Sequence, residues 1–429
     1  MKYLPIASEL FITNRTKFIK FLKPNSVAIF TSNDAMPTNA DGTMGFRQNS
    51  DLFYLTGIDQ DNTMLVLYPD AVTKEHKEIL FIKETNEHIA IWEGAMLNKA
   101  QGTTVSGIEN VQWVSSFKGA LQAFIYQTEH IYLNANEHAR QGNVTQTAQD
   151  RLNMWIKEKY SLHKTERSAP IMHRIRALKT EHELALIKHA CNITEKGFRR
   201  LLPFVKPEVM EYEIEAELIH EFVRNRSQGF AYGPIIASGI NACVLHYVDN
   251  NKACKAGDVI LLDVAAEYGN YASDMTRCLP VSGRFTPRQK AVYNAVQRVM
   301  NASIKMLTVG NTFEKYNLAV GELMTEELLQ LGLITTEEVK AQKEKLPAYK
   351  KYFMHGTSHF LGLDVHDVGM FQEPMQAGMV FTCEPGIYIR EEGLGIRLEN
   401  NILITPTGQL DLMANIPINA EEIEDLMNK

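Results

Sequence analysis

Short apolar runs separated by turn residues characterise the first third of the chain. They cover residues 27–30, 64–68, 79–82 and 131–133, and each has the length and composition of a buried β-strand. A helical pattern of apolar positions follows over residues 145–159. Strands and helices in this arrangement predict a small N-terminal α/β domain.

A domain boundary is expected near the Ser-Ala-Pro sequence at residues 168–170, and amphipathic helical patterns dominate after it. A capping box at residues 180–183 starts a long helix, and a second helix is expected over residues 211–226. The Thr-Pro-Arg-Gln sequence at residues 286–289 supplies a cap residue, a proline in the first turn and a glutamine three residues after the cap, so it starts another helix. A further helix ends near Gly332.

Apolar runs between these helices predict β-strands over residues 259–267, 271–280, 379–383 and 396–405. Hairpins with helices outside them are typical of an α+β domain built around an antiparallel sheet. We therefore expect two domains, a smaller α/β domain over residues 1–172 and a larger α+β domain over residues 173–429.

Two aspartates lie on either side of the turn in the first of these hairpins. If the hairpin is centred between Tyr268 and Gly269, Asp263 and Asp274 lie directly opposite each other. Like charges in this position destabilise a sheet, and Asp263 follows two leucines in an apparent core strand. Because a buried carboxylate without a partner is costly, the pair requires a proton or a cation.

Two glutamates, Glu384 and Glu399, flank a second turn at residues 391–395, each within an otherwise apolar strand. If all four carboxylates face the same interior, two divalent cations balance their charge. Oxygen ligands joined by one imidazole suit Mn²⁺, Co²⁺ or Zn²⁺ better than a metal that prefers thiolates. The sequence therefore predicts a paired-metal site.

The imidazole predicted for this site is that of His359, which lies close to His355 and His366. A single buried histidine is more often a structural core residue than a ligand. Three histidines within twelve positions, beside glycine and aspartate, favour a functional role instead. Their spacing is not His-Glu-x-x-His, which argues against a thermolysin-like zinc site.

Composition and charge exclude several classes of function. Of the 429 residues, 45% are hydrophobic and 22% are charged, which is ordinary for a globular protein. A net charge of −7 without a run of Lys and Arg argues against nucleic-acid binding, and no apolar stretch is long enough to span a membrane. With no secretory signal, and with five cysteines but no Cys-x-x-Cys pair, we expect reduced, buried thiols in a cytoplasmic protein.

The ordered set of acidic and histidine motifs resembles that of the "pita-bread" metallopeptidases, from about residue 175 to the C-terminus. The motifs are Asp263 with Asp274, residues 355–359 (His-Gly-Thr-Ser-His), residues 384–386 (Glu-Pro-Gly) and residues 397–399 (Arg-Leu-Glu). The resemblance implies a pita-bread catalytic domain that binds two divalent metal ions, with Mn²⁺ expected and Co²⁺ or Zn²⁺ as alternatives. It implies that Asp274 and Glu399 bridge the metals, that Asp263 binds one metal, and that His359 with Glu384 binds the other.

Two further segments resemble the proline-specific members of this family. Residues 46–57 are similar to the N-domain signature of the aminopeptidase P group, and residues 238–247 are similar to the segment that supplies an active-site histidine, here His246. The resemblance implies hydrolysis of the bond before proline in the second position of a peptide. That bond is a tertiary amide in a constrained chain, which ordinary peptidases do not cut.

The resemblance also implies a role for each matching residue. A water molecule activated by the two metals attacks the carbonyl before proline. Glu384 moves the proton as general base, and His246 stabilises the developing oxyanion. The other matching positions position the peptide (His355 and His366) or orient the ligands (Tyr388 and Arg397).

Two alternatives stay open at this point. Prolidases, which take only dipeptides, commonly carry an arginine in the loop that corresponds to residues 370–378, but this loop contains no basic residue. We therefore expect longer peptides to be cleaved as well. A binding module that has lost catalysis is the second alternative, and the intact ligand positions argue against it. The family also leads us to expect a homo-oligomer, either a dimer or a tetramer.

Overall fold

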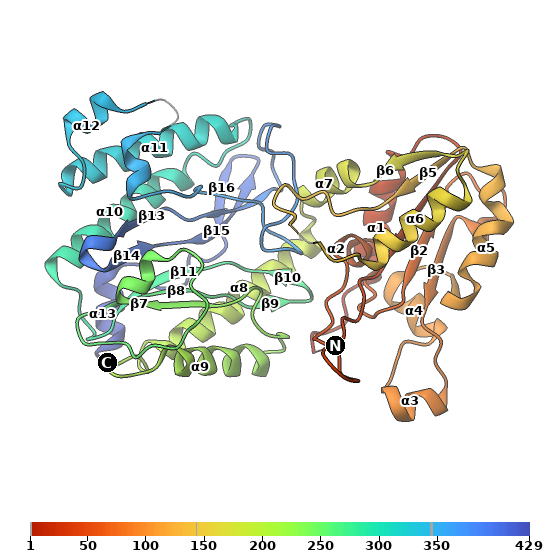
Figure 1. Ribbon diagram of the computed structural model, residues 1–429, viewed down its shortest axis with the longest axis horizontal. Coiled ribbons are helices and arrows are strands. Elements are labelled where there is room, and N and C mark those ends of the chain that lie inside the picture. Colours follow the sequence, from red (N-terminus) through yellow and green to blue (C-terminus); the bar gives the residue numbers. More distant parts are fainter. Residues whose placement is uncertain (1, 143, 344–345) are drawn as a thin grey trace. The chain divides into compact units, whose positions relative to one another are not determined.

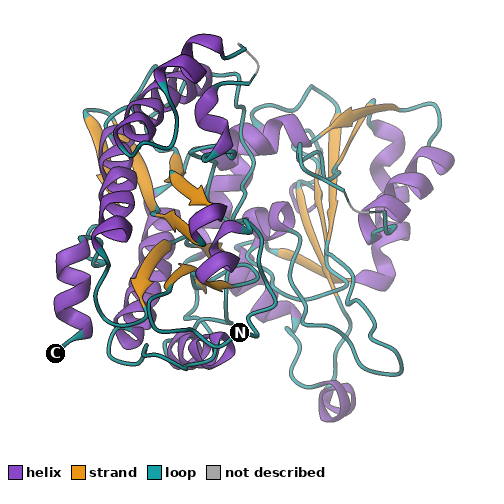
Figure 2. Ribbon diagram, turned by 60° about the vertical axis from the view of Figure 1, so that its left-hand side comes forward, coloured by secondary structure: helices purple, strands orange, loops and turns teal. Residues whose placement is uncertain are grey.

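The computed structural model describes residues 2–142, 144–343 and 346–429, and the chain forms two compact units. The first unit comprises Pro5–Arg176, and the second comprises Lys2–Leu4 together with Ala177–Lys429. Figure 2 shows that strands lie among helices in both units. Each unit is described separately below.

The first unit is built on a six-stranded mixed sheet with the order β4-β3-β2-β1-β5-β6. The β1–β2 and β2–β3 pairs are antiparallel, whereas β1–β5, β5–β6 and β3–β4 are parallel. The elements are α1 (Ser8–Ile19), β1 (Ser26–Thr31), α2 (Ser50–Thr56), β2 (Met64–Leu67), η1 (Lys74–His76), β3 (Glu78–Ile82), α3 (Glu87–Glu93), α4 (Lys99–Ser106), β4 (Asn110–Trp113), η2 (Val114–Ser116), α5 (Phe117–Phe124), η3 (Ile125–Gln127), β5 (His130–Leu133), α6 (Ala148–Lys159), β6 (Lys164–Arg167) and α7 (Ala169–Ala177).

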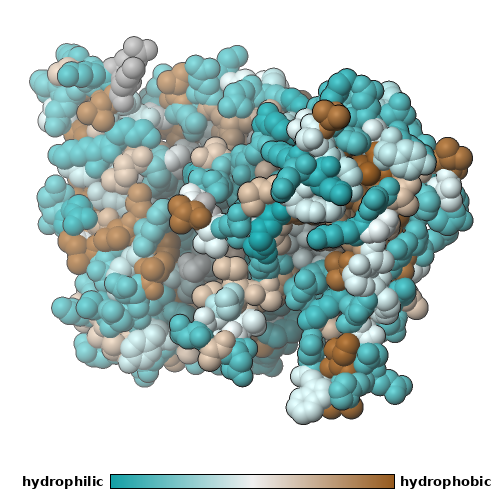
Figure 3. All heavy atoms as spheres, turned by 45° about the vertical axis from the view of Figure 1, so that its right-hand side comes forward, coloured by the Kyte–Doolittle hydropathy of each residue, from teal (hydrophilic) through white to brown (hydrophobic). Residues whose placement is uncertain are grey.

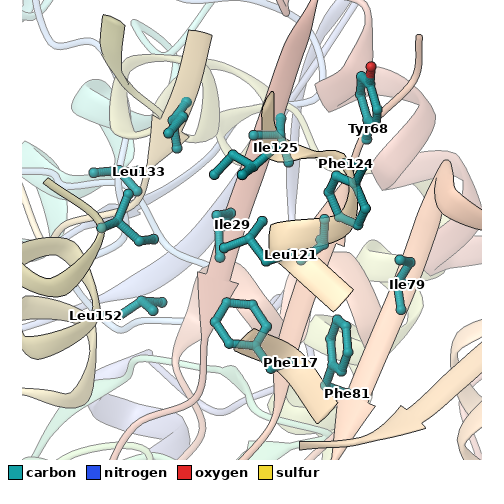
Figure 4. Packing of buried hydrophobic residues seen from close by; sticks show 14 of the residues in the cluster. Ile29, Tyr68, Ile79, Phe81, Phe117, Leu121, Phe124, Ile125, Leu133 and Leu152 are labelled. Atoms are coloured by element: carbon teal, nitrogen blue, oxygen red, sulfur yellow. The ribbon is translucent and has the colours of Figure 1, made fainter. Parts of the chain in front are cut away.

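Helices cover both faces of this sheet, so its central strands are apolar throughout. Ile29 of β1 packs with Phe117 and Leu121 of α5 and with Leu152 of α6 in one buried cluster (Figure 4). The next residue, Phe30, points to the opposite face, where its ring lies 5.3 Å from that of Phe18 in α1. A strand buried on both faces reads as an uninterrupted apolar run, which is the pattern in the sequence.

The second unit contains short antiparallel sheets, with helices on either side of them (Figure 1). The strand orders are β11-β8-β7 and β12-β15-β16, with two hairpins, β9-β10 and β13-β14. The elements are α8 (Glu181–Leu201), α9 (Glu211–Arg224), β7 (Ile235–Ser238), η4 (Gly239–Cys243), β8 (Val259–Asp263), β9 (Glu267–Tyr268), β10 (Tyr271–Ala272), β11 (Thr276–Pro280), α10 (Pro287–Ile304), α11 (Phe313–Gln330), α12 (Thr336–Ala341), η5 (Ala348–Lys351), β12 (Val380–Cys383), β13 (Gly386–Ile389), η6 (Arg390–Glu392), β14 (Leu394–Arg397), β15 (Asn400–Thr405), β16 (Gly408–Asp411) and α13 (Ala420–Met427).

The predicted helix starts are confirmed. Thr180 and Thr286 each accept a hydrogen bond from the third residue of the helix that follows, and Glu183 and Gln289 return the bond in complete capping boxes. Pro287 occupies the first turn of α10. The predicted strands are present as well, but three of the long runs are broken. Residues 259–267 divide into β8 and the start of β9, residues 271–280 into β10 and β11, and residues 396–405 into β14 and β15.

The predicted register of the first hairpin is wrong by two residues. Tyr268 pairs with Tyr271, so the turn consists of Gly269 and Asn270, which both have positive φ. This is the two-residue turn that matches the twist of a hairpin. Asp263 therefore lies opposite Thr276 and not opposite Asp274. A shift of two keeps side chains on the same face of a hairpin, whereas a shift of one reverses them, so the two aspartates still face the same interior.

The cysteines and the surface agree with the analysis of composition. All five cysteines are free and buried. Polar side chains make up most of the face of the molecule shown in Figure 3. Among the described residues, no helix combines the length and the apolar character needed to cross a membrane.

Candidate metal centre

Three predicted ligands meet at one buried point of the second unit. One ligand atom from each of Asp274, His359 and Glu399 lies within 4.8 Å of the other two. Asp274 comes from the break between β10 and β11, and Glu399 from the break between β14 and β15. Both acidic side chains therefore come from positions where a predicted strand is interrupted and the backbone leaves the ladder of the sheet.

The imidazole of His359 is oriented by its backbone neighbour. Its Nδ1 lies 3.0 Å from the carbonyl oxygen of Phe360, to which it donates its proton. Nε2 is thereby directed at the carboxylates, 3.4 Å from Oδ2 of Asp274 and 3.6 Å from Oε1 of Glu384. A ring nitrogen that donates to a carbonyl leaves the other nitrogen as the metal ligand, which is the usual arrangement at histidine metal sites.

Glu384 joins the cluster across the second hairpin. Cys383 pairs with Asn400 and Gly386 pairs with Arg397, so Glu384 and Glu399 are in register between these two pairs. The two glutamates thus occupy matching positions in the gap between these ladders, where like charges are unfavourable in the absence of a cation.

Asp263 lies at the end of β8, and its carboxylate accepts two hydrogen bonds. Arg397 Nη2 donates to Oδ2 at 2.6 Å, and the hydroxyl of Tyr232 donates to Oδ1 at 2.6 Å. Arg397 also donates from Nη1 to the hydroxyl of Tyr388 at 2.9 Å, and this hydroxyl lies 2.7 Å from Nε2 of His355. A continuous chain of hydrogen bonds therefore joins His355 to Asp263.

The same guanidinium reaches Glu399 through a threonine. Arg397 Nε donates to Thr276 Oγ1 at 3.1 Å, and that hydroxyl donates to Oε2 of Glu399 at 2.7 Å. The backbone of Asp274 is held separately, since Asn401 accepts from its N–H at 3.1 Å and donates to its carbonyl at 2.7 Å. These bonds orient the carboxylates of Asp263 and Glu399 and hold the backbone of Asp274.

Burial makes the charged form of these carboxylates costly. Burial and the neighbouring carboxylates raise the pKa of Glu384 to about 7, and they raise the pKa of Glu399 well above its ordinary value. Burial also raises the pKa of Asp263, although Arg397 opposes the increase. Burial alone would lower the pKa of His359, but Asp274 and Glu384 outweigh burial and raise it. The cluster therefore needs additional positive charge.

Two observations indicate that this site suits a cation. Oε1 of Glu399 is buried and has no hydrogen-bond partner among the described residues, whereas its other oxygen is bonded to Thr276. Within the described part of the chain, Arg397 is the one guanidinium that forms an ion pair with any of these four carboxylates. Carboxylate oxygens with one imidazole are the donors that Mn²⁺, Co²⁺ or Zn²⁺ accept. The residues present therefore suit a bound divalent metal.

The other predicted site residues lie beside this cluster. The ring of His366 lies 4.3 Å from that of His359, edge to face. Burial and Arg397 lower the pKa of His355 to about 3, with smaller contributions from Lys350 and His246. His246 therefore lies close enough to act electrostatically on His355, although it belongs to the exposed segment that follows η4.

Sequence reasoning missed several residues that hold the ligands in place: Tyr232, Thr276, Arg277 and Asn401. Arg277 is fully buried and donates from Nη1 to the carbonyl oxygen of Glu399 at 2.7 Å. A buried arginine inside an apolar strand was a usable signal, because such a charge is rarely placed without partners. Tyr232 lies in an irregular segment with no periodicity, so its position depends on the tertiary fold.

Comparison with known proteins gives matches over both units. Residues 185–406 match the model of metallopeptidase family M24, and residues 11–132 match that of the aminopeptidase P N-terminal domain. The Xaa-Pro aminopeptidase of Escherichia coli is 31% identical, over 98% of this chain and 98% of its own. The mitochondrial intermediate cleaving peptidase 55 of Arabidopsis thaliana is 28% identical, over 99% of this chain and 83% of its own.

Solved structures agree with these matches. Aminopeptidase PepP of Pseudomonas aeruginosa superposes with a TM-score of 0.89 at 29% identity, covering 100% of this chain and 99% of its own. Aminopeptidase P of Escherichia coli, solved with the inhibitor Pro-Leu, superposes with a TM-score of 0.87 at 30% identity, covering 99% of each chain. The expected pita-bread fold with a smaller N-terminal domain is confirmed, and the chain belongs to metallopeptidase family M24 and carries an aminopeptidase P N-terminal domain.

Proposed function

We propose that this chain is a metal-dependent Xaa-Pro aminopeptidase, which releases the N-terminal residue from peptides with proline in second position. One observation supports it most: the buried cluster of Asp274, His359 and Glu399 lies in a chain that aligns over 98% of its length with an Xaa-Pro aminopeptidase. The cluster supplies the chemistry of a hydrolase, and the full-length match supports the preference for proline.

The five ligand residues hold two divalent ions in this proposal, with Mn²⁺ as the preferred metal and Co²⁺ or Zn²⁺ as alternatives. Asp274 and Glu399 would be shared by both ions, Asp263 would bind one of them, and His359 with Glu384 would bind the other. When bound, the ions supply Lewis acidity that activates water and polarises the carbonyl before proline. The unpartnered Oε1 of Glu399 supports its role as a ligand, because a buried carboxylate oxygen without a donor or a cation is costly.

Proton transfer is assigned to Glu384. Its carboxylate lies at the edge of the cluster, with Oε1 3.6 Å from Nε2 of His359 and Oε2 3.9 Å from Nδ1 of His355. From this position it takes the proton of the attacking water and passes it to the leaving prolyl nitrogen.

Histidines surround the position of the substrate. His246 donates a hydrogen bond to the oxyanion that develops on the scissile carbonyl. His355 and His366 position the peptide on either side of the cluster. Tyr388 and Arg397 do not touch the substrate but hold Asp263 and His355 in place through the chain of hydrogen bonds described above.

The length of the peptide distinguishes this function from that of a prolidase. A dipeptide places its carboxylate beside the proline, and a desolvated carboxylate requires a cation, usually a bidentate arginine. The loop over residues 370–378 offers no basic side chain, and Glu373 adds a negative charge. A longer peptide, whose chain continues as neutral amides, needs no such partner.

The decisive experiment compares specificity constants after loading with Mn²⁺. We expect kcat/KM for an Xaa-Pro-Yaa-Zaa tetrapeptide to equal or exceed that for the matching Xaa-Pro dipeptide. A tetrapeptide with alanine in place of proline serves as the control and is expected to be cleaved poorly. Strong preference for the dipeptide, with little cleavage of the tetrapeptide, would make the protein a prolidase.

The proposal extends to assembly and location. We expect a homo-oligomer, a dimer or a tetramer, that acts on peptides in the cytoplasm and binds neither nucleic acid nor membrane. The five free, buried cysteines support a reducing compartment. Sedimentation velocity of the purified protein tests the oligomeric state directly.

A further inference from the structure

The segment that carries His246 has few regular elements of its own. It leaves the sheet at Ser238, the last residue of β7, forms the short helix η4 and continues without regular structure to Lys252. His246 itself is exposed, whereas its neighbour Tyr247 is 8% exposed. The position of the imidazole therefore depends on how the backbone of this segment is held.

A single carboxylate holds both ends of the segment. Oε1 of Glu211 accepts from the N–H and the hydroxyl of Ser238, at 2.9 and 2.7 Å. Oε2 accepts from the hydroxyl of Tyr247 at 2.8 Å and from the N–H of Lys252 at 3.0 Å. Ser238 begins the segment and Lys252 ends it, so Glu211 closes the loop on which His246 lies.

The carboxylate is itself rigid and fully desolvated. Glu211 is 0% exposed and is the first residue of helix α9, where the helix dipole favours a negative charge. Its own N–H donates to the carbonyl oxygen of Lys252 at 2.9 Å. Among the residues that the structure describes, no charged side chain pairs with it, and its four donors are two backbone amides and two hydroxyls. Such a site holds a carboxylate in one orientation, because every lone pair has a fixed donor.

Tyr247 transmits this constraint to the histidine. Its hydroxyl is fixed by Glu211, and burial together with Glu211 raises its pKa to about 12, so it stays protonated and remains a donor. Adjacent residues share one peptide bond, and the anchored ring therefore limits where His246 can lie. We propose that Glu211 is a positioning residue, which aligns His246 with the scissile carbonyl by closing the loop over residues 238–252. This inference rests on the role of His246 in the proposed function.

A double-mutant cycle tests the coupling of the two residues. In Mn²⁺-loaded enzyme, Glu211→Gln replaces one acceptor oxygen with a donor that faces the Tyr247 hydroxyl and the Lys252 N–H. We expect kcat on an Xaa-Pro tetrapeptide to fall by up to about 10²-fold with little change in KM, since misplacement of a group that acts on the transition state lowers kcat. In a His246→Ala background, Glu211→Gln should then change kcat little. An equal loss in both backgrounds would overturn the proposal.

Hydrogen exchange provides a readout that needs no substrate. We expect amides of residues 239–252 to exchange faster in Glu211→Gln than in the wild type, with exchange in α11 (Phe313–Gln330) unchanged. Unchanged exchange over residues 239–252 would show that Glu211 does not hold the segment. If the wild type cleaves no Xaa-Pro peptide, the proposed function fails, and hydrogen exchange still decides whether Glu211 closes the loop.

Two further variants separate positioning from general loss of structure. Glu213→Gln makes the same change of charge in the same turn of α9 on an exposed side chain, and it should leave kcat and exchange as in the wild type. Tyr247→Phe removes one hydroxyl and keeps the buried ring. If Glu211→Gln does not fold, Tyr247→Phe decides: a fall in kcat that is absent in the His246→Ala background supports the proposal, and an unchanged kcat overturns it.

Discussion

Glu384 is proposed to have two roles, as a metal ligand and as the general base. Its neighbour Cys383 has a buried thiol that points away from the cluster and lies 3.7 Å from the hydroxyl of Tyr316. Consecutive strand residues face opposite sides, so the order of residues alone separates the acid from the thiol. The same alternation argues against Cys383 as a metal ligand.

We predict that Glu384→Gln removes most of the activity and leaves the folded protein intact. A carboxamide cannot accept the proton of the attacking water, and loss of a general base costs about 10²- to 10⁴-fold in rate. The measurement is kcat/KM on an Xaa-Pro tetrapeptide together with metal content by mass spectrometry. Activity near that of the wild type, at unchanged metal content, would refute the assignment of the proton to Glu384.

At the scale of elements, β14 packs closely against η4, the short helix that precedes His246 in the sequence. A methyl group on Gly395 would lie 2.3 Å from the carbonyl oxygen of Ala242, closer than real contacts permit. The strand that leads to Arg397 and Glu399 and the segment that leads to His246 are thus in van der Waals contact only because residue 395 has no side chain.

Gly395→Ala is therefore expected to destabilise the protein by about 1–3 kcal/mol, the usual cost of overpacking a buried contact. Thermal unfolding followed by circular dichroism measures the change. Gly408→Ala is the matched control, because it lies in a strand of the same unit with no atom within 4 Å of the added methyl group. Equal midpoints for the two variants would contradict the prediction.

A second contact between elements is the buried ion pair of Lys179 and Asp367. Nζ of Lys179, just before α8, donates to Oδ2 of Asp367 at 2.9 Å, and each side chain is 1% exposed. Asp367 follows His366, so the pair holds the loop that presents that histidine. Burying two charges gains little overall, but removing one of them leaves the other without compensation.

The single variant Lys179→Met should lower the free energy of unfolding by about 3–5 kcal/mol. Adding Asp367→Asn removes the buried charge that Lys179 balanced and should recover part of that loss. Urea denaturation of the single and double variants measures both values. If the double variant is no more stable than Lys179→Met alone, the loss of stability does not come from the buried charge of Asp367.

Local patterns in the sequence predicted the elements that have strong periodicity or capping signals and missed those that do not. The predicted helix over residues 145–159 corresponds to α6 (Ala148–Lys159), and the capping boxes of α8 and α10 are present. The sequence analysis did not identify α3 (Glu87–Glu93) or the edge strand β6 (Lys164–Arg167). β6 consists of charged and polar residues, so only pairing with β5 makes it a strand.

The same limit applies to the site. The sequence pattern singled out Asp263, Asp274, Glu384 and Glu399, because an acidic residue inside an apolar run is conspicuous. It did not give the pairing of Asp263 with Thr276, which depends on the conformation of the Gly269-Asn270 turn. Nor did it give the bonds from Asn401 and Arg277, since they join strands whose separation in the sequence is more than a hundred residues.

At the scale of the whole molecule, binding of the metal is expected to stabilise the folded state. A cation that binds only the folded chain stabilises it by about 2.7 kcal/mol when its concentration is 100-fold above Kd. We expect Mn²⁺ to raise the midpoint of thermal unfolding and a chelator to lower it. Glu399→Gln should abolish this response, whereas Glu314→Gln, in the first turn of α11, should keep it. A response that survives Glu399→Gln would place the metal elsewhere.

The division of the ligands between two hairpins has a consequence for how the protein folds. Asp263 and Asp274 belong to one hairpin, while Glu384 and Glu399 flank another, more than a hundred residues later. Each hairpin closes a short loop and can form within microseconds, whereas the docking of the two hairpins closes a long one and is slow. Both bring like charges to the surfaces that must meet, so without metal the late step works against electrostatic repulsion. We therefore expect refolding to be faster when divalent cations are already present, because they offset this repulsion, and stopped-flow refolding with and without Mn²⁺ measures the difference.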